Sequence, residues 1–324
     1  MSRNDIKEQT DMFGYGSKLG DPESVDTVSG DPETSEFKRS ARRHQSEWRE
    51  SRGLKPGKQP MRPKDDLWRF IGSRLDIQDA DALGSNFITP AARAAADDRV
   101  ANQEPHQTLN ADRLYSDLLS SMPMCFNLFG PLHEDLELAD RAIHAWWPDT
   151  PGKVRAVRFE WSPGRRVVGK YLGNRSAFDV AFELDLGDGR SGIIGVETKY
   201  HEHCKPERAP NLDKRMPRYA EVTQKSGLFA SDTLDRIVGT KIQQIWLDHL
   251  LALSMPITDS NHWAWVKFVL VHPAGNPSYA KVATEYRSLL MDESTFDVVT
   301  IESLLDSGVI PLDSVNAFRE RYFW

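Results

Sequence analysis

SAFDVAFELDLGDGRSGIIGVETKY, residues 176–200, consists of two strand-like segments on either side of a glycine-rich turn. Val, Ile and Phe recur in both segments, and Asp188-Gly189 is a dipeptide suited to a tight reversal. An antiparallel hairpin folded about position 188 places Asp179 opposite Glu197. A register shifted by one residue still leaves these two carboxylates close together. Because side chains alternate along a strand, Lys199 shares the face of Glu197.

The segments around this hairpin predict a layered α/β domain. A helical pattern over 110–145, interrupted near Pro123 or Gly130-Pro131, precedes a third strand-like segment, KVRAVRFEWSP. After the hairpin come a polar loop (201–232), an amphipathic helix (233–254), a strand (262–273), a helix (278–290), a strand within 297–305 and a final helix. This order predicts a mixed central sheet flanked by helices.

Three regions are expected along the chain. Residues 1–34 form an acidic, flexible segment, 35–109 a helical N-terminal extension, and 110–324 the α/β domain. Within the extension, a basic helix runs from Ser35 to about Gly53, and a Pro/Lys-rich linker follows. DLWRFIGSRL (66–75) has a short helical pattern, and Thr89-Pro90 is a strong signal for a helix start.

Composition limits the class of protein. Hydrophobic residues make up 39% of the 324 residues and charged residues 27%. The two cysteines, Cys125 and Cys204, are too few for a disulfide framework or a four-cysteine zinc site. We find no apolar run suited to a signal peptide or a membrane span, and we expect a cytoplasmic protein without a membrane partner.

Charge is distributed unevenly around a net value of −7. Residues 1–37 hold nine acidic and three basic residues, whereas 38–62 hold nine basic and two acidic ones. Residues 153–175 hold seven basic residues and one acidic residue, Glu160. These two basic blocks are either solvated surface or contacts for nucleic acid.

Asp179, Glu197 and Lys199 together predict a phosphodiester hydrolysis site. Two carboxylates opposite each other on a sheet repel, and a hard divalent cation between them removes that repulsion. A neighbouring lysine can hold or deprotonate a metal-bound water. The alternative is a solvated Glu/Lys pair beside an Asp, but the hairpin and the β-α-β continuation favour the hydrolytic site.

The pattern Asp179-x17-Glu197-Thr198-Lys199 resembles the PD-(D/E)XK nuclease superfamily. The resemblance implies a restriction-endonuclease-like αβββαβ core over about residues 110–273. SARRHQSEWRE, LLSSMPMCFNLFG and QQIWLDHLLA also resemble a bacterial subgroup with this fold, which extends the similarity to about 38–324. Phe178 departs from the motif, because it stands where the superfamily often has proline.

The resemblance also implies roles for individual residues. Asp179, Glu197 and the backbone carbonyl of Thr198 would bind Mg²⁺ or Mn²⁺, and Lys199 would orient the attacking water. A glutamine on the following helix often faces the site, and Gln244 is favoured over Gln243. Glu160 is the first candidate for a further acidic ligand, ahead of Glu134 and Glu137. The alternative role for Glu160 is a salt bridge to a neighbouring arginine.

Basic side chains near the expected site are candidates for phosphate contacts. They are Arg165, Arg166, Lys170, Arg175, Arg208, Lys214, Arg215 and Arg218. The aromatic residues among them, Trp161, Tyr171 and Tyr219, can stack on bases or belong to the core, and the core is favoured for Trp161.

Two weaker signals lie nearby. His201, His203 and Cys204 follow the Glu197–Lys199 strand, but no matching second half of a zinc site is present, and a loop near the substrate is favoured. His249 on the amphipathic helix is expected to be buried and hydrogen-bonded.

These features predict a Mg²⁺-dependent nuclease that acts on DNA, and analogy alone suggests defence against foreign DNA. The alternatives are a catalytically silent nucleic-acid-binding or assembly protein with the same fold, and a nuclease directed at RNA. A homodimer or larger oligomer is a further expectation, because superfamily nucleases often cut both strands as dimers. An activating protein partner is a separate expectation.

Overall fold

The computed structural model describes residues 35–60, 68–105, 107, 109–165, 167, 169–210 and 214–324. The expectations for the acidic segment 1–34 and for Arg166 fall outside these residues. In the described part of the chain, none of the helices combines the length and the apolar character needed to cross a membrane.

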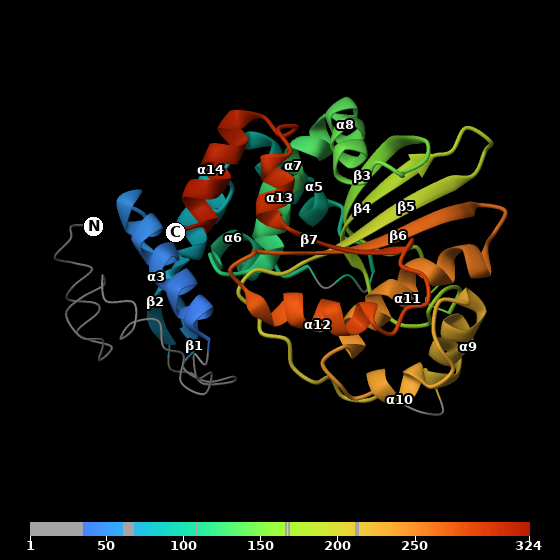
Figure 1. The fold of residues 1–324 in the computed structure, drawn as a ribbon. Coiled ribbons are helices and arrows are strands. Elements are labelled where there is room, and N and C mark those ends of the chain that lie inside the picture. Colours follow the sequence, from blue (N-terminus) through green and yellow to red (C-terminus); the bar gives the residue numbers. More distant parts are fainter. Residues whose placement is uncertain are drawn as a thin grey trace.

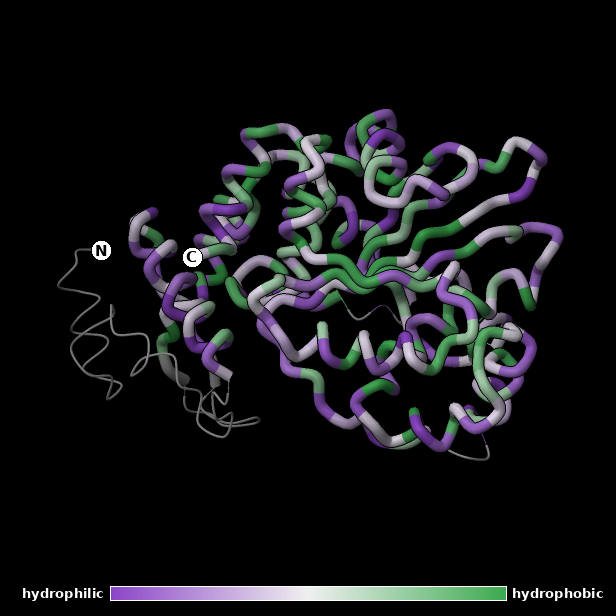
Figure 2. Tube along the Cα trace, in the orientation of Figure 1, coloured by the Kyte–Doolittle hydropathy of each residue, from purple (hydrophilic) through white to green (hydrophobic). Residues whose placement is uncertain are grey.

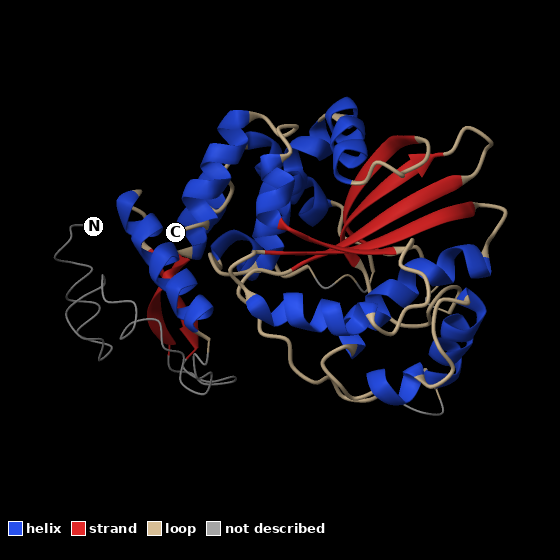
Figure 3. Ribbon diagram, in the orientation of Figure 1, coloured by secondary structure: helices blue, strands red, loops and turns tan. Residues whose placement is uncertain are grey.

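A five-stranded mixed sheet forms the centre of the molecule, with the strand order β3-β4-β5-β6-β7 (Figures 1 and 3). The first three strands are antiparallel, and β5, β6 and β7 run parallel to one another. The strands are β3 (Lys153–Trp161), β4 (Phe178–Asp185), β5 (Ser191–Thr198), β6 (Trp263–His272) and β7 (Phe296–Thr300). Val180 pairs with Val196, which is the hairpin register predicted from the turn.

Helices cover both faces of this sheet (Figure 1). One face packs on α9 (Met216–Ser226), α10 (Thr233–Ile237), α11 (Gln243–Thr258) and α12 (Pro277–Arg287). The opposite face packs on α7 (Ser121–Glu134), α8 (Leu136–Trp146) and α13 (Ile301–Asp306), with α5 (Pro90–Ala101) and α14 (Leu312–Tyr322) behind them. Figure 2 shows hydrophobic residues concentrated along the strands, which are buried between the two helical layers.

Glycines make two features of the central hairpin possible. Gly187 and Gly189 have φ values of +79° and +82°, a left-handed backbone that glycine adopts without a steric penalty. In β5, a Cβ atom on Gly195 would lie 2.4 Å from the Phe178 ring. The ring of Phe178 therefore packs directly on the backbone of β5, next to the position of Asp179.

The N-terminal extension is not wholly helical. Its elements besides α5 are α3 (Glu36–Ser51), β1 (Pro56–Pro60), β2 (Trp68–Leu75) and α4 (Ile77–Leu83), and α6 (Ala111–Ser116) follows it. The helical expectation for 66–75 was wrong over its described residues, because 68–75 form β2, which pairs antiparallel with β1. Prolines are tolerated in β1 since both strands of a two-stranded sheet are edge strands.

Two predicted helix boundaries also differ from the structure. The helices of 110–145 are interrupted at 117–120 and Asp135, whereas Pro123 and Gly130-Pro131 lie inside α7. Pro123 is in the first turn, where its missing amide costs no hydrogen bond. The helix expected over 233–254 is divided into α10 and α11, and Gly239, with φ +76°, lies at the break.

The extension and the C-terminal helix meet at the residue that follows Lys199. Gln45 on α3 donates from Nε2 to the Tyr200 hydroxyl and to the Arg321 carbonyl, at 2.9 Å in both cases. The Tyr200 hydroxyl donates in turn to the Tyr322 carbonyl at 3.3 Å. Tyr200 is therefore fixed by two segments that are distant in sequence.

Candidate active site

Three carboxylates lie level with one another on adjacent strands. Val180 pairs with Phe159 on one side and with Val196 on the other, so Asp179 is level with Glu160 and Glu197. Asp179 is at the beginning of β4, whereas Glu160 and Glu197 are near the ends of their strands. The antiparallel register alone thus brings the acidic side chains to one edge of the hairpin.

Thr198 holds the carboxylate of Asp179 in place. The Thr198 amide and its hydroxyl both donate to Oδ2 of Asp179, each at 2.7 Å. Burial raises the pKa of Asp179, although the charge of Lys199 and these two donors oppose the shift. Oδ2 is thereby engaged by the protein. Since the N–H and C=O of one strand residue point to the same neighbour, the Thr198 carbonyl is also directed toward Asp179.

Glu197 has two partners in the site. Lys199 Nζ lies 2.6 Å from Oε1, and Gln244 Nε2 donates to the same oxygen at 3.3 Å. The side chains of Glu197 and Lys199 are only 13% and 10% exposed, so the pair is largely shielded from water. Burial and the charge of Asp179 raise the pKa of Glu197 to about 7.

Lys199 is held in its protonated form. Burial alone would lower its pKa, but the negative charges around it, Glu197 first, hold the pKa well above the usual value. The Tyr279 ring of α12 lies 5.7 Å from Nζ and adds a cation–π contact. This environment favours a lysine that orients groups and balances charge over one that removes a proton from water.

Glu160 has an unusual backbone and a strongly shifted carboxyl group. Its φ is +47°, a left-handed conformation that costs about 1–3 kcal/mol for a residue other than glycine. Arg165 Nη2 and Gln107 Nε2 donate to the Glu160 carbonyl at 2.8 and 3.1 Å and hold this conformation. Burial and the charges of Asp179 and Glu197 raise the pKa of Glu160 to about 8.

The other acidic candidates are placed elsewhere. Glu134 and Glu137 are exposed near the junction of α7 and α8. Two arginines on the same strand as Glu160, Arg155 and Arg158, bind Glu183. Glu160 is thus the candidate acidic residue that lies beside Asp179.

The two adjacent glutamines at the start of α11 have different partners. Gln244 contacts Glu197, as described above. Gln243 is buried, accepts from the Gly239 amide at 2.8 Å and donates to the Arg208 carbonyl at 2.9 Å. Gln243 therefore stabilises the entry to the helix, and Gln244 is the one that reaches the site.

Two acidic residues near the site were not singled out from the sequence. Glu202 accepts from Ser121 Oγ and from the Tyr200 amide, each at 2.7 Å. Burial would raise the pKa of Glu202, but nearby positive charges and these donors lower it to about 2. Asp248 lies one turn after Gln244 on α11, and burial and the charge of Glu197 raise its pKa well above the usual value. The helical spacing of 244 and 248 was the signal that could have revealed Asp248.

The predicted phosphate contacts differ in their exposure and in the partners that the structure gives them. Arg165 is buried and supports Glu160, which does not favour a role in binding phosphate. Arg218 is half-buried and binds the Tyr171 carbonyl, Glu221 and Thr258. Lys170 is exposed and paired with Asp259 at 2.8 Å. The remaining described residues of this set are exposed: Arg175, Arg208, Lys214 and Arg215.

The other expected side chains near the site are structural. Cys204 is buried and donates from Sγ to the Lys241 carbonyl at 3.1 Å. His249 is buried between the Tyr286 hydroxyl, at 2.8 Å, and Thr295 Oγ1, at 2.9 Å. Tyr171 and Tyr219 are buried, and Trp161 packs beside Phe178.

The donor set fits a metal that keeps part of its water shell. Within the described ranges, no three His, Cys, Asp or Glu side chains are grouped so that they could hold a metal ion by themselves. Mg²⁺ does not require such a cage, because proteins usually hold it through one or two carboxylates, waters and substrate phosphates. Asp179 and Glu197 would supply two carboxylates, and the Thr198 carbonyl would supply a further oxygen.

A hairpin with an Asp on one strand and a Glu-x-Lys on the next, inside a mixed sheet covered by helices, defines a restriction-endonuclease-like α/β protein. Residues 31–324 match the PD-(D/E)XK nuclease superfamily, and the chain belongs to this superfamily. No curated protein and no solved structure matches the chain.

Proposed function

We propose that this protein is a Mg²⁺-dependent nuclease that hydrolyses phosphodiester bonds of DNA. The observation that carries the proposal is the register of the β3–β4–β5 strands, which sets Asp179 level with Glu197 and Glu160, together with the 2.6 Å contact of Lys199 Nζ with Glu197. The superfamily of the chain supports a nuclease, and the choice of DNA follows from what most of that superfamily cuts.

Asp179, Glu197 and the Thr198 carbonyl would hold the metal, with Glu160 as a further candidate. When bound, Mg²⁺ or Mn²⁺ acts as a Lewis acid on the phosphate and lowers the pKa of a bound water. The hydrogen bonds from Thr198 keep Asp179 in one rotamer, and Gln244 restrains Glu197. Both carboxylates are thus oriented before any ligand arrives.

Lys199 would stabilise the negative charge that develops on the phosphate and orient the attacking water. A protonated ammonium that is 10% exposed acts in a medium of low dielectric constant, where its attraction for an anion is strong. Glu202, through its charge, and Tyr279, through its ring, would act as positioning residues for this ammonium.

Exposed cations would bind the phosphate backbone on either side of the cut. Arg208 is linked to the site because its carbonyl accepts from Gln243, the neighbour of Gln244. Arg175 lies four positions before Asp179, and Lys214 and Arg215 precede α9. If these four residues each neutralise a phosphate, a plot of the logarithm of the affinity against the logarithm of the salt concentration has a slope of about −3 to −4.

The test is cleavage of plasmid, linear duplex, single-stranded DNA and RNA in Mg²⁺ or Mn²⁺. We expect DNA cleavage that is lost with EDTA and reduced at least about a hundredfold in Asp179→Asn and in Lys199→Met. Lys267→Ala is the matched control, because Lys267 is a lysine on β6 whose Nζ binds the Ser294 carbonyl.

Cleavage that survives both substitutions would refute the site. Salt-sensitive binding of DNA without cleavage under any condition would instead support a catalytically silent binding protein. RNA cleavage without DNA cleavage would assign the site to RNA. The mass in solution, measured with and without DNA, tests the expected homodimer. A role in the cytoplasm against foreign DNA, with or without an activating protein, is part of this proposal and is tested by challenging cells that carry Lys199→Met.

A further inference from the structure

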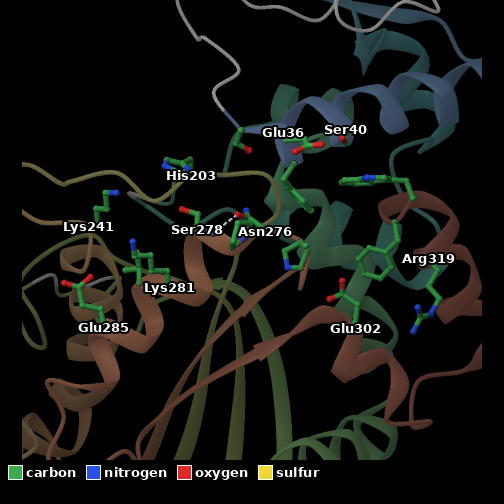
Figure 4. Close-up of a pocket in the computed structure, with 18 residues that line it drawn as sticks. Glu36, Ser40, His203, Lys241, Asn276, Ser278, Lys281, Glu285, Glu302 and Arg319 are labelled. Carbon is green, nitrogen blue, oxygen red and sulfur yellow. Dashed lines mark hydrogen bonds between the residues drawn. The ribbon is translucent and has the colours of Figure 1, made fainter.

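A pocket of about 1000 Å³ lies on the far side of α12 from Lys199. Its lining comes from the start of α3, the loop after Tyr200, the first turns of α12 and the last residues of the chain (Figure 4). The volume is sufficient for a ligand the size of a nucleotide, since small-molecule pockets span roughly 300–1,000 Å³. None of the residues proposed for hydrolysis lines it.

The two ends of the pocket differ in chemistry. His203, Lys241 and Lys281 gather at one end (Figure 4). Both lysines are exposed at the surface, and Glu285 lies beside Lys281 as the acidic group at this end. Arg319, at the opposite end, is engaged by Asp306 at 2.6 Å. Lys241 and Lys281 are therefore the ammonium groups placed to receive an anion.

Aromatic rings and acceptors line the rest of the pocket. The rings of Phe37 and Trp324 lie 5.0 Å apart, and Trp324 is 56% exposed. An exposed indole beside a second ring is a stacking surface for a flat heterocycle. Glu36 and Ser40, on the first turns of α3, offer oxygens that suit ribose hydroxyls or exocyclic amino groups.

We propose that this pocket binds a nucleotide, with its phosphate at Lys241 and Lys281 and its base against Phe37 and Trp324. Glu36 and Glu302 would repel a continuous phosphate backbone along the whole pocket, so the fit is to one nucleotide with one anionic end. That nucleotide is either free or a single residue turned out of a nucleic-acid strand. The binding does not depend on whether the protein cleaves DNA.

Asn276 and Ser278, which line the pocket, also form hydrogen bonds with the segment that follows Lys199. Asn276 Nδ2 donates to the carbonyls of Tyr200 and Glu202, at 3.0 Å in both cases, and Ser278 Oγ accepts from the Cys204 amide at 2.8 Å. On the inner side of α12, Tyr279 faces Lys199. A nucleotide that orders the first turn of α12 would therefore also restrain the segment that carries Lys199.

The test is a calorimetric titration in EDTA, which keeps metal-bridged binding at the hydrolytic site out of the measurement. The probes are AMP, adenosine, inorganic phosphate and a 5′-phosphorylated hexathymidylate. We expect saturable binding of AMP, with adenosine and phosphate each about tenfold weaker or more, because each lacks one half of the contacts. Asp179→Asn should bind AMP as the wild type does.

Pocket variants decide the assignment. Lys241→Ala/Lys281→Ala and Trp324→Ala should each weaken AMP at least about tenfold, whereas Lys281→Arg and Trp324→Phe should retain most of the affinity. Lys267→Ala and Leu312→Ala are controls for a half-buried lysine and an exposed apolar residue outside the pocket, and should bind as the wild type does. Unchanged melting curves show that the variants are folded.

Displacement of AMP by the hexathymidylate would identify a nucleotide of a strand as the ligand, and failure to displace it would identify a free nucleotide. No saturable binding of either probe up to about 5 mM, a limit near the weakest specific affinities, would overturn the proposal. Binding that persists in all pocket variants, or that inorganic phosphate matches, would overturn it as well.

Discussion

Replacing Gly195 by alanine should disturb the strand position of Asp179 without touching a proposed catalytic group. A Cβ atom at 195 would lie 2.4, 2.5 and 2.6 Å from three atoms of the Phe178 ring, well under the 3.0 Å that real Cβ contacts respect. The ring has little room to retreat, because it is fully buried between Trp161 and Phe268.

The expected cost follows from two opposing effects. Overpacking a filled core costs about 1–3 kcal/mol. Replacing a strand glycine by alanine regains roughly 0.5–1 kcal/mol of backbone entropy. We therefore expect a net loss of about 1–2 kcal/mol in the free energy of unfolding, and a lower cleavage rate, because Phe178 is covalently joined to Asp179 and catalysis is sensitive to small displacements.

Urea denaturation of four proteins measures this effect: wild type, Gly195→Ala, Phe178→Leu and the double variant. Phe178→Leu removes ring atoms, so the double variant should lose less stability than the two single losses combined, with a coupling of at least about 0.5 kcal/mol. Gly192→Ala is the matched control on the same strand, because its Cβ would meet the flexible Leu184 side chain at 3.1 Å.

Equal urea midpoints for wild type and Gly195→Ala would refute this reasoning. Strictly additive losses in the double variant would show that the Phe178 ring is not what the new methyl group meets. A loss of stability with full cleavage activity would separate the packing of Phe178 from the placement of Asp179.

Three further predictions concern other parts of the molecule. Burial lowers the pKa of His249 to about 3 from 6.5, so its stabilising contribution is complete above pH 6.5 and is lost as the pH falls toward 3. Between pH 7.5 and 4.5 the free energy of unfolding should fall by about 2–3 kcal/mol for this reason. The urea midpoint of His249→Gln should therefore depend less on pH than that of the wild type. Parallel curves of urea midpoint against pH would contradict the lowered pKa. Arg321 is fully buried, with Nε and Nη1 lacking a partner among the described residues, so Arg321→Met should be neutral or stabilising in thermal melts. A loss above about 3 kcal/mol would show that its contact with Trp48 and the Nη2 hydrogen bonds to Asn86 and the Leu118 carbonyl dominate. At about tenfold excess over its dissociation constant, Mg²⁺ should stabilise the wild type by about 1.4 kcal/mol and leave the melting temperature of Asp179→Asn unchanged. Equal shifts in the melting temperatures of the two proteins would place the ion elsewhere.

The hairpin could be predicted because its information is local. The Asp188-Gly189 turn fixes the register, and the register alone sets Asp179 level with Glu197. Residue type and spacing were sufficient for the hairpin. The place of Gln244, by contrast, was expected from the resemblance to the superfamily, which often has a glutamine on this helix.

Other features depend on contacts between distant segments, which no local pattern carries. β2 is a strand because a proline-containing segment pairs with it, and its own sequence also suits a helix. Arg165 belongs to a basic block but is buried against the Glu160 carbonyl, and charge density cannot distinguish this from a surface arginine. Glu202 depends on Ser121, 81 positions earlier in the chain.

The hydrogen bonds of Gln45 to Tyr200 and to the Arg321 carbonyl have a practical consequence for dissecting the protein. A shortened chain that begins at residue 110 retains every proposed metal ligand. It nevertheless lacks Gln45, so the hydroxyl of Tyr200, the residue after Lys199, loses the hydrogen bond that Gln45 donates to it. Loss of cleavage in such a fragment could then result from a displaced Lys199 side chain as readily as from weaker binding of the substrate. The described residues of 35–109 are in this sense part of the proposed catalytic geometry, and Gln45→Leu in the full chain separates the two effects.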